Sequence, residues 1–212
     1  MYLPLYFDPK KLTCLIIGGG TVAARKASVL ITAGCRLTVI APELDDSIRA
    51  AVASGRAAWK QRTFQPGDCS GFRLVVAATP DEAVNRAVAA EAMQVGIPVN
   101  VVDAPQLCSV VFGASWQDGP LTVSVSTGGR APFMASEVRN RIAEDAVGMG
   151  QWIEAAGRFR EAVREGVRST EDRSKLYQVF AARARSESPE DLPDCRSLEE
   201  WLQWLGVPRP SP

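Results

Sequence analysis

Three consecutive glycines near the start of the chain constrain its fold more than any other feature. The apolar run Leu15–Ile17 leads directly into Gly18–Gly20, and helix-forming residues begin at Thr21. This order predicts a buried strand, a tight turn and a helix, with a G-x-G-x-x-A pattern that ends at Ala23. The first glycine permits the turn, the second lets the backbone approach a pyrophosphate, and the alanine lets the helix pack on the strand. Because a helix N-terminus presents free N–H groups and a positive dipole end, the stretch predicts a dinucleotide-binding unit.

Apolar segments alternate with helical segments over roughly residues 10–112. Helices are expected after the glycines, over residues 44–54 and over residues 80–95. An apolar segment over residues 2–7 is expected to be an edge segment or short strand, since Pro4 is tolerated only at an edge. The order of elements predicts an α/β fold with a Rossmann-type doubly wound parallel sheet. The expected strands are Thr13–Ile17, Leu37–Ala41, Ala57–Arg62, Phe72–Ala78 and Pro98–Val102, and the expected buried stripe of the first helix is Val22, Val29, Leu30 and Ala33.

The pattern changes after residue 112. Two strands, Ser109–Ser115 and Leu121–Ser126, are expected to form a hairpin. A helix should begin at Pro132 and end near residue 146, broken by Gly148 and Gly150, and the rest of the chain reads as helical. We therefore expect a dinucleotide-binding domain over residues 1–112, a small α+β segment over residues 113–147 and a helical domain over residues 148–212.

Charge and composition exclude several classes of function. The 212 residues carry 24 Lys and Arg against 24 Asp and Glu, so no net charge favours nucleic acid or a membrane surface. No apolar run approaches the about 20 residues that span a bilayer, and the first residues do not resemble a secretory signal. The five cysteines form no C-x-x-C pair, which indicates reduced thiols in the cytoplasm and argues against a bound metal. Histidine is absent, so acid–base chemistry must use other side chains.

The end of the second expected strand bears on the type of nucleotide. In this fold an acidic residue about 20 positions after the glycines often binds the ribose hydroxyls. Here the strand ends at Ala41, and Pro42 and Glu43 follow, where we expect the adenosine end of the cofactor. No Lys or Arg follows before Arg49, so no clamp for a 2′-phosphate is evident and NAD is favoured over NADP. The alternative is that Glu43 only places a negative charge at the start of the next helix.

Five segments, taken in order and spacing, carry a resemblance to a known family. They read GGGTVAARKA, LTVIAPE, LVVAATPDEAVN, PVNVVDAP and VSVSTGGRAP. Together they resemble the precorrin-2 dehydrogenase family, which includes the dehydrogenase/ferrochelatase portion of siroheme synthase. The resemblance covers roughly residues 1–145. It implies NAD-dependent oxidation of precorrin-2 to sirohydrochlorin in sirohaem biosynthesis, followed in bifunctional members by insertion of ferrous iron, and it leaves open whether this chain inserts iron. No methyltransferase domain follows, so we expect the upstream methylations to be done by another protein.

The resemblance also implies an assembly and site residues. Family members are homodimers in which the segment after the nucleotide domain, here residues 113–147, interlocks between subunits, and the helical tail closes a tetrapyrrole cleft. Asp103 matches the aspartate proposed in the family as general base, and Thr21, Val22, Pro42 and Glu43 match the NAD contacts. Thr127 stands where some members have a serine. We also expect the cofactor to contact Gly18, Gly19, Gly20 and Thr79.

The residues around Asp103 agree with a catalytic role on their own terms. Asp103 lies just past the end of the fifth expected strand, where open α/β sheets place their ligands. Oxidation of precorrin-2 releases a hydride and a proton, and a carboxylate near the nicotinamide assists the proton step. The alternative is that Asp103 only caps the turn before Ala104 and Pro105.

The substrate is an octacarboxylate, so its cleft must be locally basic. Arginine suits bidentate carboxylate binding, and we expect substrate contacts from Arg130, Arg139 and Arg141, with Asn100 and Ser109 lining the cleft. For any single arginine the alternative is a solvated helix face with i, i+4 ion pairs. A second function also fits the glycine pattern, namely a non-catalytic NAD-binding regulatory module. The PVNVVDAP and STGGRAP segments and the helical tail favour the enzyme, because a sensing module has no need of them.

Overall fold

Five parallel strands form one sheet in the computed structural model, which describes residues 2–210. They run in the order β3-β2-β1-β4-β5, which is the Rossmann-like arrangement that the sequence predicts. The strands are β1 (Thr13–Ile17), β2 (Arg36–Ile40), β3 (Ala57–Lys60), β4 (Leu74–Ala77) and β5 (Val99–Val101). The sheet belongs to the first of two compact units, Met1–Phe112 and Gly113–Pro212, which are described separately.

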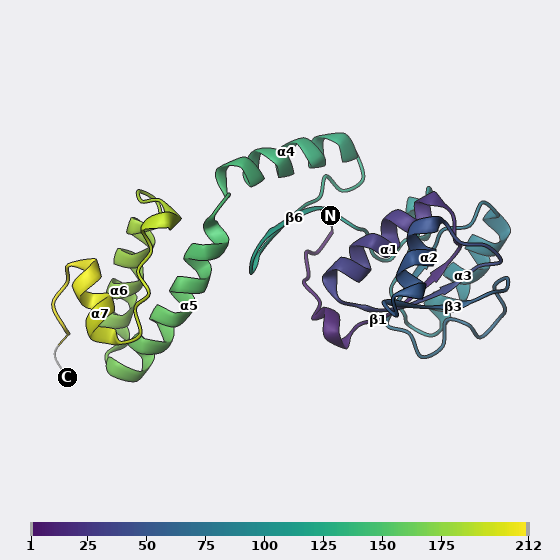
Figure 1. Cartoon of the computed structure of the whole chain (residues 1–212). Coiled ribbons are helices and arrows are strands. Elements are labelled where there is room, and N and C mark those ends of the chain that lie inside the picture. Colours follow the sequence, from purple (N-terminus) through teal and green to yellow (C-terminus); the bar gives the residue numbers. More distant parts are fainter. Residues whose placement is uncertain (1, 211–212) are drawn as a thin grey trace. The chain divides into compact units, whose positions relative to one another are not determined.

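Helices cover both faces of the sheet. Helices α1 (Thr21–Ala33) and α2 (Asp46–Ala53) pack on one face, and α3 (Glu82–Gln94) packs on the other (Figure 1). Side chains of a strand alternate between faces, so Cys14 and Ile16 of β1 join one core while Leu15 and Ile17 join the other. A strand buried on both faces must be largely apolar, which explains the apolar runs of β1, β4 and β5, whereas β3 at one edge of the sheet exposes Ala58 and Lys60.

The connection from β3 to β4 contains no helix, as the expected order of elements implies. Residues 61–73 instead lay Phe64, Cys69 and Phe72 on the α3 face of the sheet. The loop is held by a salt bridge of 2.5 Å between Arg62 and the largely buried Asp68. The Arg62 guanidinium lowers the pKa of the Asp68 carboxyl by donating hydrogen bonds to it. This loop therefore buries part of the α3 face of the sheet, as a helix does elsewhere.

Two expectations for the first unit are wrong. Residues 2–7 form no strand and are exposed, with Leu3 79% and Tyr6 70% accessible. In α1 the residues that face the core are Ala23, Ala24, Ala27 and Leu30, whereas Val29 is 46% exposed and Ala33 is exposed. The glycine turn brings α1 close to the sheet, and only small side chains fit in that space.

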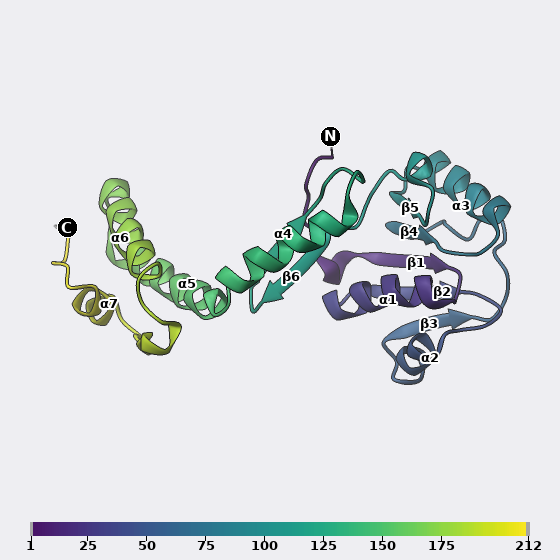
Figure 2. The same cartoon turned by 90° about the horizontal axis from the view of Figure 1, so that it is seen from above.

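The second unit begins with a hairpin and a helix that packs along it. Strands β6 (Ala114–Asp118) and β7 (Leu121–Val125) pair antiparallel, and α4 (Pro132–Asp145) lies beside them (Figure 2). The first strand lies further along the chain than the expected Ser109–Ser115. Gly119 has a positive φ of 53° and, with Pro120, makes a two-residue turn, while the N–H of Ser109 donates to the carbonyl of Val99, the first residue of β5.

Three helices complete the second unit around an aromatic core. They are α5 (Met149–Gly166), α6 (Thr170–Arg183) and α7 (Leu198–Leu205). Trp152, Phe159, Phe180 and Trp201 are at most 4% exposed and contact one another. Gly148 separates helix α4 from helix α5 as expected, but Gly150 lies inside α5. Over residues 2–210 no helix has both the length and the apolar character needed to cross a membrane.

Candidate functional site

Gly18 is required by its backbone and by its neighbours. Its φ is +116°, and its N–H donates a hydrogen bond of 2.9 Å to the carbonyl oxygen of Ile40. A Cβ atom on this residue would lie 2.3 Å from the carbonyl oxygen of Ala78. The turn after β1 is therefore wedged between the ends of β2 and β4, and only glycine fits there.

Gly19 is required for a different reason, which the sequence does not reveal. A Cβ atom would lie 2.0 Å from the carbonyl oxygen of Glu43 and 2.9 Å from the Cβ of Ala41. The Gly19 carbonyl also accepts a hydrogen bond of 2.7 Å from the N–H of Asp45. The glycine turn is thus fixed to the loop between β2 and α2, and this close approach of two backbones leaves no room for a side chain.

Gly20 has no such internal reason to be glycine. Its φ of −80° is ordinary, and a Cβ atom would meet no atom of the described residues within 4 Å. Gly20 is the N-cap of α1 and provides no capping side chain, and the first turn of α1 has no acidic residue. The first intrahelical bond runs from the N–H of Ala24 to the Gly20 carbonyl at 2.9 Å. The open space and the N–H groups ahead of that bond fit a dinucleotide pyrophosphate.

The loop between β2 and α2 is held from β3. The indole Nε1 of Trp59 donates to the Ala41 carbonyl at 3.0 Å, which leaves Pro42 and Glu43 exposed beside the glycine turn. Helix α2 begins at Asp46, and Asp45 is its N-cap because its carboxylate accepts from the N–H of Ser47 at 3.0 Å. The N-terminal charge of α2 therefore comes from residues after Glu43, which argues against the alternative explanation of Glu43.

Asp103 has an unusual backbone. Its φ is +56°, and among residues 2–210 it is the one non-glycine residue with a positive φ. It is separated from the end of β5 by Val102, whose N–H donates to the Ala77 carbonyl at 3.0 Å. Asp and Asn are the residue types that tolerate this conformation best. The Asp103 side chain is exposed, and within the described chain it takes part in no hydrogen bond or ion pair. Asp103 thus does not cap the turn, and its carboxylate is free to act on a ligand.

The Cys108 thiol, which the sequence analysis does not predict to have a role, holds the segment after Asp103 against β5. The Cys108 thiol lies 3.1 Å from the backbone nitrogen of Val101 and 3.2 Å from its carbonyl oxygen. Two residues expected to contact substrate also hold this segment. Asn100 is 7% exposed and donates to the Val110 carbonyl at 3.0 Å, and the Ser109 hydroxyl accepts from the N–H of Val99 at 2.8 Å. Their polar atoms therefore serve the fold, and substrate contact by either residue stays a prediction.

The three arginines predicted to bind substrate lie in the second unit. Arg139 donates from Nη1 to the Ser115 carbonyl at 3.2 Å, and its Nε is buried without a partner in the described part of the chain. Arg141 pairs with Glu137 one turn earlier on α4 at 3.0 Å, the surface pair that the alternative reading expects. Arg130 is exposed in the loop before α4, just after Gly128 and Gly129 with positive φ. Of the three arginines, Arg130 is thus the one whose guanidinium does not bond to α4 or to the hairpin.

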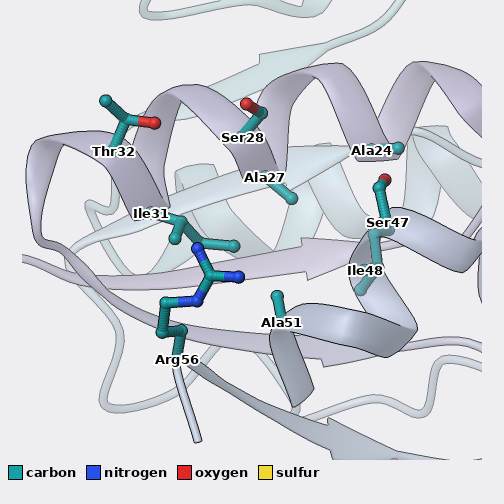
Figure 3. A pocket seen from close by; sticks show the side chains of 9 residues that line it. All are labelled: Ala24, Ala27, Ser28, Ile31, Thr32, Ser47, Ile48, Ala51 and Arg56. Carbon is teal, nitrogen blue, oxygen red and sulfur yellow. The ribbon is translucent and has the colours of Figure 1, made fainter. Parts of the chain in front are cut away.

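A small cavity of about 190 Å³ lies between α1 and α2, apart from these residues. Its walls combine small apolar residues with three hydroxyls, and the Arg56 side chain reaches toward Ile31 (Figure 3). None of the residues predicted to contact the cofactor lines it. The lining residues are Ala24, Ala27, Ser28, Ile31, Thr32, Ser47, Ile48, Ala51 and Arg56.

Two protein families match this chain, one over the parallel sheet and one over the hairpin and α4. Residues 5–114 match the family described as "Putative NAD(P)-binding", which covers the whole sheet. Residues 118–144 match the family described as "Sirohaem biosynthesis protein central", which covers most of the hairpin and α4.

Curated relatives and a solved structure extend the match. Siroheme synthase of Methylococcus capsulatus is 40% identical over 220 residues, which cover 97% of this chain and 46% of the relative. Siroheme synthase of Pseudomonas aeruginosa is 41% identical over 178 residues, covering 84% of this chain and 38% of the relative. The chain thus spans less than half the length of these curated relatives. The structure of "SirC, precorrin-2 dehydrogenase" superposes with a TM-score of 0.73 at 22% identity, covering 97% of this chain and 99% of that one, which shows the same fold.

Proposed function

This chain belongs to the precorrin-2 dehydrogenase/ferrochelatase family that forms the N-terminal part of siroheme synthase, and on that premise we propose that it oxidises precorrin-2 to sirohydrochlorin with NAD. The observation that carries the proposal is the free Asp103 carboxylate, held in a left-handed conformation at the end of β5. The glycine turn lies at the same edge of the sheet, after β1, because the carboxyl ends of parallel strands share one edge.

The chain's own residues bind, orient and deprotonate. The N–H groups in the first turn of α1 hold the pyrophosphate, and Gly20 leaves room for its close approach. NAD, when bound, supplies the acceptor for the hydride. The oxidation of precorrin-2 also releases a proton, and the Asp103 carboxylate accepts it. The reaction then balances as loss of one hydride to the cofactor and one proton to the carboxylate.

The preference for NAD rests on the loop after β2. Glu43 is an exposed carboxylate beside the glycine turn and is suited to the two ribose hydroxyls of NAD. The first basic residue after it, Arg49, is turned to its own loop, because its Nη2 donates to the Leu44 carbonyl at 3.1 Å. A 2′-phosphate would therefore meet the Glu43 carboxylate without help from Arg49, and kcat/KM should be higher with NAD than with NADP.

The test of this function uses purified full-length chain, NAD and precorrin-2, with the absorption of sirohydrochlorin and of NADH as the two readouts. Equal amounts of both products support the dehydrogenase. Protein that is folded and binds NAD but forms neither product would instead support the regulatory module.

Iron insertion is tested separately, with ferrous iron as a substrate. Metal insertion removes two pyrrole N–H protons, and Asp103 is a free carboxylate at this edge of the sheet. Mixing the chain with sirohydrochlorin and Fe²⁺ in the absence of NAD isolates this step. Sirohaem formation above the rate without protein, and its loss in Asp103→Asn, would assign both reactions to one site.

We also propose that a second copy of the chain covers α4. Met134, Val138 and Ile142 follow one another every four residues and are 43%, 39% and 40% exposed. Such an apolar stripe on a helix is typical of a face that packs against a partner. The family resemblance supports a second subunit as that partner.

Val138→Glu is expected to convert the dimer into a monomer, because it buries a charge in the interface. Light scattering coupled to size-exclusion chromatography measures the mass. The control is Asn140→Glu, which adds the same charge to an exposed position of α4 that lies on another face of the helix. A wild-type chain that is monomeric at micromolar concentration would contradict the dimer.

A further inference from the structure

Asn85 on α3 is a buried polar side chain that forms hydrogen bonds with the backbone N–H, the carbonyl and the hydroxyl of Thr79. It is 7% exposed. Its Oδ1 accepts from the backbone N–H of Thr79 at 3.1 Å and from the Thr79 hydroxyl at 2.9 Å, and its Nδ2 donates to the Thr79 carbonyl at 2.9 Å. Three hydrogen bonds between two side-by-side residues, one of them buried, hold the pair in one arrangement. Asn85 therefore determines where Thr79 lies.

Thr79 in turn belongs to the loop against which the glycine turn is packed. The hypothetical Cβ of Gly18 would lie 2.3 Å from the carbonyl oxygen of Ala78 and 3.1 Å from the nitrogen of Thr79. The N–H of Ala78 donates to the Ile17 carbonyl at 2.8 Å, so this loop and the glycine turn leave their strands together. Any shift of residues 78 and 79 therefore moves one wall of the glycine turn.

We propose that Asn85 is a positioning residue for the dinucleotide site, acting through Thr79 on the glycine turn. The inference rests on the proposed binding of NAD and adds a residue that does not itself touch the cofactor. The remaining bonds of Thr79 support this role. Its hydroxyl also accepts from the N–H of Asp81 at 3.2 Å and lies 3.0 Å from the Asp81 carbonyl oxygen, a second acceptor for its one proton, and Asp81 is the N-cap of α3. Helix α3 thus holds the loop both through its N-cap and through Asn85.

The same helix supplies a matched control. The Glu91 carboxylate accepts from the N–H of Gly67 at 2.8 Å and from that of Cys69 at 2.7 Å. Glu91 therefore also joins α3 to the backbone of a loop. That loop leads into β4 at its amino end, whereas the loop held by Asn85 leaves β4 at its carboxyl end. Removing either side chain leaves backbone N–H groups of a loop without a partner, but only one of the two loops borders the glycine turn.

The experiment compares Asn85→Ala with Glu91→Ala in the full chain. Isothermal calorimetry measures the dissociation constant for NAD at a temperature well below both unfolding transitions. We expect Asn85→Ala to weaken binding about tenfold or more and Glu91→Ala to change it less than about twofold, although both lower Tm. Equal changes in the two variants, or an unchanged dissociation constant in Asn85→Ala, would overturn the inference.

Two further measurements keep the result interpretable. Wild-type chain that binds neither NAD nor NADP would overturn the proposed function, and with it the premise of the inference, before any variant is compared. Should Asn85→Ala fail to fold, Asn85→Ser replaces it, since the serine hydroxyl bonds to the carbonyl four residues earlier and, unlike a methyl group, tolerates water beside the unpaired Thr79 N–H and carbonyl. Asn85→Ser is expected to weaken NAD binding severalfold, and an unchanged dissociation constant would overturn the proposal.

Discussion

Replacing Asp103 by Asn is expected to lower kcat for precorrin-2 oxidation by about 10²–10⁴-fold, the usual contribution of a positioned general base. The reason is the loss of the one group at this edge of the sheet that we assign to proton removal. The dissociation constant for NAD should change less than about twofold, because the Asp103 carboxylate makes no bond to the glycine turn or to the loops beside it. Single-turnover measurements with saturating NAD separate the chemical step from binding.

The left-handed backbone of Asp103 decides which substitution is informative. Asn accepts a φ of +56° about as well as Asp does, so Asp103→Asn removes the charge and leaves the loop unchanged. Asp103→Ala removes the same charge but places an alanine in a conformation that costs about 1 kcal/mol or more. We therefore expect the asparagine variant to keep the wild-type Tm and the alanine variant to melt earlier. An Asp103→Asn variant with wild-type turnover would remove Asp103 from the mechanism.

Strands β1, β4 and β5 were predictable because almost every residue in them is buried, and such strands are largely apolar. Strand β3, at one edge of the sheet, exposes Ala58 and Lys60. Turn residues mark the ends of the strands, so the sequence places all five within a few residues. The β6–β7 hairpin was harder. The segment from Ser109 is as apolar as a strand, yet Ser109 is bonded to Val99, the first residue of β5. The start of the hairpin's first strand therefore depends on a tertiary contact, which local sequence patterns do not predict.

The candidate site likewise has features that are local in the sequence and features that depend on residues far apart in the chain. The glycine pattern and the place of Asp103 after a strand are local features, and both could be predicted from the sequence. The reason for Gly19 is the approach of Glu43, 24 positions later, and Asn85 acts on a loop that precedes its own helix. The positive φ of Asp103 also depends on the closure of its loop by Cys108. Asn85 shares the buried stripe of α3 with Val88, Ala89 and Ala92, and a polar residue at that helical spacing is the signal in the sequence.

Gly20→Ala is expected to leave the fold intact and to weaken NAD binding about tenfold or more. A methyl group at this position meets nothing within 4 Å in the described chain, and alanine adopts a φ of −80° without strain, so Tm should fall little. The methyl group would occupy the space that we assign to the pyrophosphate. Losing one hydrogen bond to a charged group costs about 1.5–3 kcal/mol, and every 1.4 kcal/mol is a factor of ten in affinity.

Gly18→Ala is the matched variant, and its expected outcome differs for a physical reason. Its methyl group would lie 2.3 Å from a carbonyl oxygen, at a φ of +116° that alanine avoids, so we expect a loss of about 3 kcal/mol or more in the free energy of unfolding. Thermal unfolding and calorimetry on both variants then separate two roles of adjacent glycines. A stable Gly20→Ala variant with wild-type affinity would mean that no phosphate approaches Gly20, because internal packing gives that position no other reason to be glycine.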